Sequence, residues 1–219
     1  MSSKGHTASP KPAVAFSIRA VYHYLKLNVA AGNRKAACAV AKGTVMKHRW
    51  EGDTLFFSGV LNEQMSEDSL VKMFSEAQAR QTHQKTELSL DFADVVRANS
   101  LGLKNWICAL ERIPIQGWYV RIPPWFVLQL NTIDELSIGG ALLVRSFYAP
   151  FCHAETGDVT NILVRVGEDL PIKSRYDTTD LMAVVGNDEM LQPDFEEEEY
   201  LRFIASFYDR YADIFRPRT

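Results

Sequence analysis

A short polar turn holds the residues of this sequence that are best suited to chemistry. The turn runs from Ala98 to Gly102, and Ser100 supplies a hydroxyl group at its centre. A serine or asparagine directly before a helical run of apolar residues caps the helix, and the free N–H groups of that first turn attract an anion. The pattern therefore predicts either a helix cap at Ser100 or a site that would stabilise a phosphate on Ser100.

The residues on either side of the turn predict a strand followed by a helix. Before the turn, apolar and polar residues alternate, which is typical of a strand with one face against a core and one wetter face. The apolar set is Leu88, Leu90 and Phe92, and the polar set is Glu87, Ser89 and Asp91. After the turn, apolar residues recur at spacings of three and four until Pro114, which indicates one buried helical face. These residues are Leu103, Trp106, Ile107, Leu110 and Ile113.

The surrounding pattern predicts an α/β domain over residues 44–148. Its elements are expected in this order: a hairpin at 44–64, a helix capped by Ser66 with Leu70, Phe74 and Ala77 buried, the strand and helix described above, a strand at 118–122, a short helix at 125–130 and a strand at 142–147. Strands that alternate with helices in this way favour one sheet with the helices mostly on one face.

This order, and above all the stretch LSLDFADVVRANSLGLKNW, resembles the STAS domain (sulfate transporter and anti-sigma-factor antagonist). In that family an apolar strand leads through a D-S-x-G-type turn into a helix. The resemblance covers about residues 44–148 and implies a STAS-like mixed sheet. It also implies that a partner kinase phosphorylates the serine of the turn, which is Ser100 here, with Gly102 as the turn glycine. Asn99 stands where the family commonly has an aspartate.

The resemblance implies a function in protein–protein interaction. We expect a non-enzymatic bacterial signalling protein, similar to anti-sigma-factor antagonists, whose partner is a kinase, an anti-sigma-like protein or another signalling or polarity protein. A phosphate on Ser100 would add about 1.5 to 2 negative charges and would expel an apolar or acidic partner. The residues expected to contact the partner are Asn99, Leu101, Gly102, Lys104 and Asn105.

Two extensions flank the expected domain and differ in charge. Residues 1–43 predict a mobile tail and a basic amphipathic helix, and residues 149–219 predict an added strand at 161–166 and an acidic, aromatic helix. The aromatic and apolar residues that recur at helical spacing along that last helix, which we call its aromatic stripe, are Tyr200, Ile204, Phe207, Tyr211 and Ile214. The first 50 residues hold nine of the 24 basic residues and no acidic one, so the remainder carries 15 Lys and Arg against 27 Asp and Glu.

This division of charge favours a second hypothesis, a scaffold or localisation protein. Its terminal helices would form a homodimer or anchor the protein, and the basic N-terminal helix would suit a membrane surface. The C-terminal helix would pack either on its own chain or on a partner. A third hypothesis is a sensor of a nucleotide or another small ligand, which the resemblance implies for some family members.

Local signatures of other functions are missing from the sequence. It contains no G-x-S-x-G, P-loop, G-x-G-x-x-G or H-E-x-x-H motif, so we expect neither an enzyme nor a cofactor. Cys152 and His153 lack the second pair of ligands that zinc requires, and Cys108 is expected to be a small core residue. The basic N-terminal part lacks a nucleic-acid-binding motif.

The three cysteines form no CxxC pair and no run of about 18 apolar residues occurs, so we expect a cytoplasmic protein.

Overall fold

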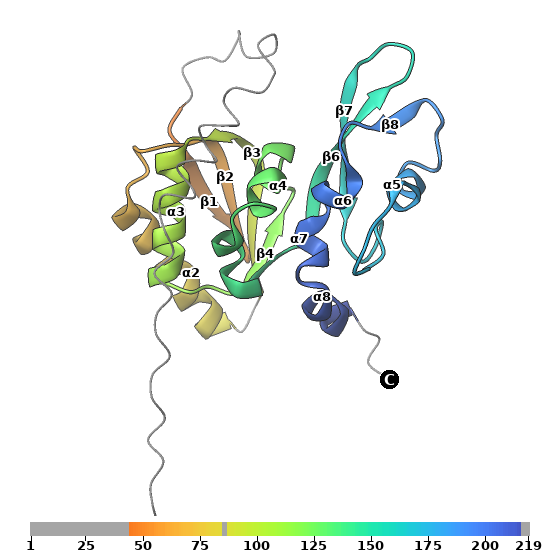
Figure 1. Cartoon of the computed structure of the whole chain (residues 1–219). Helices are drawn as coiled ribbons and strands as arrows, with labels where there is room; N and C mark the ends of the chain where they lie inside the picture. Colours follow the sequence, from red (N-terminus) through yellow and green to blue (C-terminus); the bar gives the residue numbers. More distant parts are fainter. Residues whose placement is uncertain (1–43, 85–86, 216–219) are drawn as a thin grey trace, which may run out of the picture. The chain divides into compact units, whose positions relative to one another are not determined.

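The main sheet of the molecule has five strands (Figure 1). The computed structural model describes residues 44–84 and 87–215, so the basic helix predicted within residues 1–43 lies outside the described residues. The strands, in the order in which they lie side by side, are β1 (Lys47–Glu51), β2 (Thr54–Leu61), β3 (Leu88–Ala98), β4 (Gly117–Val120) and β5 (Leu142–Val144). β1 and β2 form the predicted antiparallel hairpin, and the other neighbouring pairs are parallel. The predicted α/β class is confirmed.

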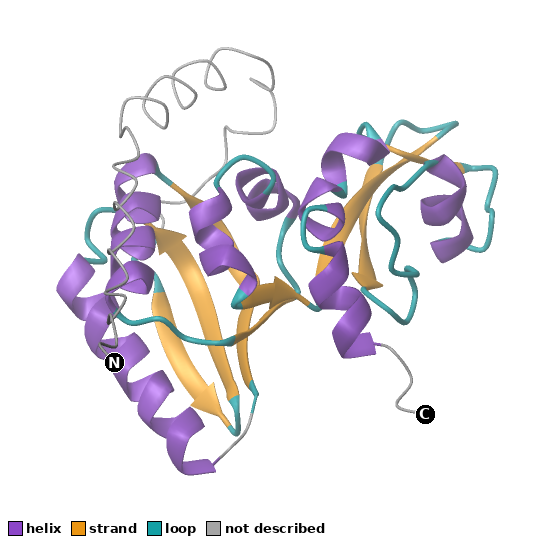
Figure 2. Cartoon of the chain, turned by 60° about the horizontal axis from the view of Figure 1, so that its bottom comes forward, coloured by secondary structure: helices purple, strands orange, loops and turns teal. Residues whose placement is uncertain are grey.

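The order of the parallel strands explains why the helices gather on one face of this sheet (Figure 2). Each parallel strand lies beside the one that precedes it in the chain. Since strand–helix–strand crossovers are right-handed, steps in one constant direction place every connecting helix on the same side. The connecting helices are α2 (Glu67–Gln84), α3 (Ser100–Arg112), α4 (Pro124–Leu130) and the 3-10 helix η1 (Asp134–Gly140).

Aromatic rings fill the space between this sheet and its helices. Phe92 of β3 lies at the centre of the cluster, with its ring centroid 5.3 Å from that of Trp106 in α3 and 4.7 Å from that of Phe126 in α4. Phe57 and Tyr119 add rings from the neighbouring strands. Tilted and edge-to-face pairs of this kind contribute about 0.5–1.5 kcal/mol each beyond the burial of their area. The predicted core positions of the strand at 88–92 are buried.

A second sheet of three antiparallel strands follows the first. Its strands, in spatial order, are β7 (Val159–Arg165), β6 (Ser146–His153) and β8 (Leu191–Pro193). β7 overlaps the strand predicted at 161–166. The domain boundary expected at Tyr148 falls inside β6, so residues 149–219 do not begin a separate element.

The prediction of one strand at 142–147 is wrong, because the chain changes partners within it. The backbone N–H of Arg145 donates to the carbonyl of Tyr119 at 2.8 Å, next to β4. The carbonyl of the same residue accepts the N–H of Val166 at 2.9 Å, beside the end of β7. β5 therefore belongs to the first sheet and β6 to the second.

The single C-terminal helix predicted from the aromatic stripe is also wrong. After α5 (Thr178–Val184), the chain forms three short helices, α6 (Glu197–Tyr200), α7 (Arg202–Ala205) and α8 (Tyr208–Phe215). The side chain of Asn131 forms hydrogen bonds with the backbone groups at the break between α6 and α7. Its Nδ2 donates to the carbonyl of Tyr200 at 2.8 Å and its Oδ1 accepts the N–H of Phe203 at 2.8 Å. These tertiary hydrogen bonds replace those that a continuous helix would make.

The stripe nevertheless packs within the chain. Tyr200, Ile204 and Tyr211 are buried, whereas Ile214 is 51% exposed. The hydroxyl of Tyr211 lies at the outer edge of β5, where it accepts the N–H of Val144 at 2.7 Å and donates to the carbonyl of the same residue at 2.9 Å. α8 therefore covers an edge strand that would otherwise offer free backbone groups.

Replacement of Tyr211 by phenylalanine is expected to destabilise the fold without changing its shape. The variant leaves a buried N–H and a buried carbonyl of Val144 without their partner, which costs about 1–3 kcal/mol. Denaturant unfolding measures the loss. Tyr208→Phe is the matched control, since this tyrosine is 37% exposed. Equal stability of Tyr211→Phe and the wild-type protein would contradict the assignment.

Candidate functional site

The turn predicted to carry the chemistry lies where β3 ends and α3 begins. Asn99 is the cap of α3: its backbone is extended, and its Oδ1 accepts the N–H of Gly102 at 2.8 Å. Ser100 is the first residue of the helix, and its side chain is exposed. The prediction of Ser100 as the cap is wrong, because the cap is the last residue with non-helical backbone angles and that residue is Asn99.

Asn99 also ties the turn to the end of β2. Its Nδ2 donates to Oε2 of Glu63 at 2.5 Å, and its backbone N–H donates to the carbonyl of Leu61 at 3.0 Å. The first of these bonds is the main reason why the pKa of the Glu63 carboxyl is below its ordinary value. An aspartate at position 99 would lack the donor and would repel Glu63. The asparagine thus has a structural role that an aspartate would not fill.

Gly102 allows α3 to approach the sheet closely. A Cβ atom at this position would lie 2.4 Å from the carbonyl oxygen of Leu61, which is far inside van der Waals contact. Gly102 is buried, so the glycine serves packing and is not on the surface expected to meet a partner.

The other residues predicted to contact a partner differ in their surroundings. Leu101 is 53% exposed, and Lys104 is exposed on the same first turns of α3. Asn105 is half-buried, and its side-chain amide donates to the carbonyl of Met65 at 2.9 Å. The exposed residues around Ser100 are Asn99, Leu101 and Lys104; together with Ser100 they form a surface that we call the α3 turn surface.

Val96 is a neighbouring exposed residue that the sequence did not reveal. The pairing of β3 with β2 shifts here: Gly59 faces Val95 but Val60 faces Arg97, so Val96 has no residue opposite it. A bulge of this kind bends the strand and redirects a side chain. Val96 is 59% exposed as a result. An apolar residue within a predicted strand gives no signal of such a shift.

Asp91, expected on the wetter face of β3, is buried in an ion pair. Its Oδ2 lies 2.7 Å from Nε and 2.6 Å from Nη2 of Arg121, and its Oδ1 accepts the N–H of Ala93 at 3.0 Å. The hydrogen bond to Asp91 is the main reason why the pKa of Arg121 is raised. The expectation of a wet carboxylate is wrong, because Arg121, whose φ of 50° lies in the left-handed region, places its side chain across the sheet.

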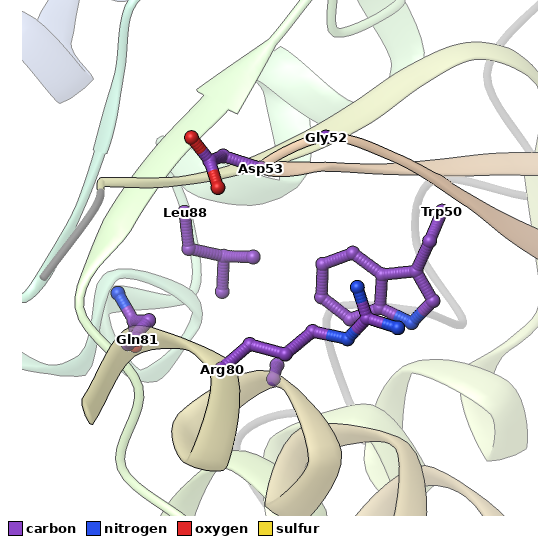
Figure 3. A pocket seen from close by; sticks show the side chains of 7 residues that line it. Trp50, Gly52, Asp53, Arg80, Gln81 and Leu88 are labelled. Carbon is purple, nitrogen blue, oxygen red and sulfur yellow. The ribbon is translucent and has the colours of Figure 1, made fainter. Parts of the chain in front are cut away.

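Two cavities of the described part of the chain differ in size, one of about 10 Å³ and the other of about 750 Å³. One lies between the β1–β2 turn and α2 and measures about 10 Å³, enough for about one water molecule (Figure 3). There the guanidinium of Arg80 lies 4.3 Å from the centre of the Trp50 ring. A wider surface hollow beside α6 and α7 carries charges of both signs: Arg175, Arg202, Glu196 and Glu199.

The cysteine and histidine candidates do not gather into a site. Groups of three or more His, Cys, Asp or Glu side chains that could hold a metal ion are absent from residues 44–84 and 87–215. Cys152 and His153 are half-buried neighbours on β6. Cys108 is half-buried on α3, and burial is the main reason why the pKa of its thiol is raised, which disfavours the reactive thiolate.

Comparison of the chain with protein-family models, with curated proteins and with solved structures gave no match. Within the part of the chain that the structure describes, no helix has the length and apolar character needed to cross a membrane.

Substitutions of Asn99 distinguish the contributions of its two side-chain hydrogen bonds, to Gly102 and to Glu63, to the stability of the fold. Asn99→Ala removes the cap and is expected to cost about 1 kcal/mol. Asn99→Asp keeps the acceptor for the Gly102 N–H but sets a second carboxylate against Glu63, so it is also expected to destabilise. Adding Glu63→Gln to Asn99→Asp restores a donor and an acceptor in exchanged positions. Denaturant unfolding should find the double variant more stable than Asn99→Asp alone; the opposite order would contradict the pairing.

The Asn99–Glu63 bond also predicts a dependence of stability on pH. Because the pKa of Glu63 is lower in the folded state, the bond stabilises the protein fully above the ordinary pKa of a glutamate. This contribution is lost as the pH falls through the lowered value. The difference in unfolding free energy between wild-type protein and Glu63→Gln should therefore shrink on acidification. A difference that grows at acidic pH would contradict this sign.

Proposed function

We propose that the protein is a non-enzymatic signalling protein that binds another protein through the α3 turn surface, in the manner of an anti-sigma-factor antagonist. The observation that carries the proposal is an exposed leucine and an exposed serine on a turn whose backbone is held in place. Leu101 projects from the first turn of α3, next to Ser100. Asn99 and Gly102 anchor that turn to the end of β2.

A fixed turn lowers the cost of binding. A partner does not have to order this backbone, because the hydrogen bonds of Asn99 already define it, so less conformational entropy is lost on association. Leu101 offers apolar area to bury, and Lys104 offers a positive charge at the rim. Val96, on the bulge that precedes the turn, is a second exposed apolar residue near the end of β3.

Phosphorylation of Ser100 is the proposed means of control. A phosphate would bring about 1.5 to 2 negative charges to an exposed position directly after Asn99. The Glu63 carboxylate is bonded to Asn99, so the phosphate and this carboxylate would repel each other. The added charge would also disfavour burial of Leu101 by a partner. The unphosphorylated protein is therefore the proposed binding form.

Affinity capture with purified full-length protein as bait tests this proposal. The baits are the wild-type protein, Ser100→Asp and Leu101→Glu, with Ser174→Asp as the matched control on an exposed loop serine. The wild-type protein and the control should retain the same partner, whereas both turn variants should lose it. All four baits should melt at nearly the same temperature, because the altered side chains are exposed. Mass spectrometry of the protein from its native host reports phosphate on Ser100.

Equal recovery of every prey protein by all four baits would refute the α3 turn surface as the binding site. Retention of the partner by Ser100→Asp together with its loss by Leu101→Glu would keep the binding site but refute control by charge at Ser100.

A further inference from the structure

The surface hollow beside α6 and α7 is large enough for a small molecule. Its volume is about 750 Å³, and small-molecule sites typically measure about 300–1,000 Å³. One wall is the loop at 174–176, and the other is formed by Glu196, Glu199, Arg202 and Ala205. The α3 turn surface contributes none of the residues that line the hollow, so this site is separate from the proposed protein-binding site.

Side-chain hydrogen bonds hold both walls of the hollow in place. On the loop, the hydroxyl of the buried Tyr176 donates to the carbonyl of Pro171 at 2.9 Å and accepts the N–H of Lys173 at 3.0 Å. On the helical wall, Asn131 bonds to the backbone on both sides of the break between α6 and α7. A ligand would therefore meet walls that are already ordered, and little conformational entropy would be lost when it binds.

Three charged side chains that line the hollow have no ion-pair partner in the part of the chain that the structure describes. Glu199 and Arg202 are three residues apart, a spacing at which opposite charges on a helix commonly pair. The break between α6 and α7 falls between them, and neither they nor Glu196 takes part in an ion pair of the described residues. Arg175 also lines the hollow but already interacts within the chain. Two carboxylates and one guanidinium thus remain to bind a ligand.

We propose that the hollow binds a small molecule with two cationic groups and one carboxylate, such as a dibasic amino acid. The carboxylate would lie against the guanidinium of Arg202, which can donate two parallel hydrogen bonds to it. The cationic groups would lie against Glu196 and Glu199. The charges then balance, because two negative groups and one positive group of the protein meet two positive groups and one negative group of the ligand. A ligand without one of these groups would leave a charge of the hollow unpaired.

The exposure of the three side chains limits the affinity of the site. Glu196, Glu199 and Arg202 are all exposed, and water and salt screen ion pairs at such positions. Three ion pairs of this kind should give a dissociation constant on the order of 1 mM. Binding should weaken as the ionic strength rises.

A nuclear magnetic resonance titration of the full-length protein with L-lysine and L-arginine tests the proposal. The backbone amide signals of residues 174–176 and 199–205 are expected to shift and to reach a plateau. L-norleucine lacks the second cationic group of L-lysine, and cadaverine lacks its carboxylate. Each of these analogues should bind at least about threefold more weakly than L-lysine, because each loses one ion pair.

Single substitutions assign the ion pairs to side chains. Arg202→Gln and Glu199→Gln should each weaken the binding of L-lysine at least about threefold. Arg97→Gln and Glu189→Gln remove exposed charges outside the hollow and should leave the binding unchanged. The same spectra show whether each variant is folded.

The absence of saturable shifts in the wild-type protein would overturn the proposal. Equal binding of L-lysine and either analogue would also overturn it, since the charges of the ligand would then not be read. Unchanged binding in both Arg202→Gln and Glu199→Gln would show that L-lysine does not occupy the hollow.

Discussion

The packing of α3 against the sheet is the constraint on which the candidate site depends. Trp106 is fully buried and meets the rings of Phe57, Phe74 and Phe92 edge to face, which fixes the helix over the central strands. Gly102 lets the first turn of the helix touch the end of β2. The turn before it is then held by Asn99, and Ser100 and Leu101 are left on the outside. The buried packing of α3 against the sheet thus determines where the α3 turn surface lies.

Side chains of the first sheet contact one another on the face opposite the connecting helices. Arg121 crosses that face to the buried carboxylate of Asp91, and the ring of Phe56 lies near the guanidinium groups of both Arg121 and Arg49. The left-handed backbone of Arg121 costs on the order of 1 kcal/mol or more. The ion pair and its hydrogen bonds offset that cost, because a lone buried carboxylate would be far less favourable.

Polar side chains satisfy the backbone wherever a regular element is interrupted. Asn131 bonds to both sides of the break between α6 and α7, and Tyr211 bonds to the edge of β5. Both contacts join residues almost 70 positions apart in the chain. These hydrogen bonds attach the C-terminal helices to the α/β core. They explain why the aromatic residues of these helices pack on their own chain.

The sequence by itself determined the element order from β1 to α4, the inward faces of β3, α2 and α3, and the place of the turn, because periodicity and turn residues act over a few neighbours. It did not determine the division of residues 142–153 between two sheets or the breaks between α6, α7 and α8, since distant groups such as Tyr119, Val166 and Asn131 supply the bonds there. The same holds for the site. The alternation of β3 predicted the side on which Asp91 lies, but only the approach of Arg121 from β4 decided that its carboxylate is buried and paired.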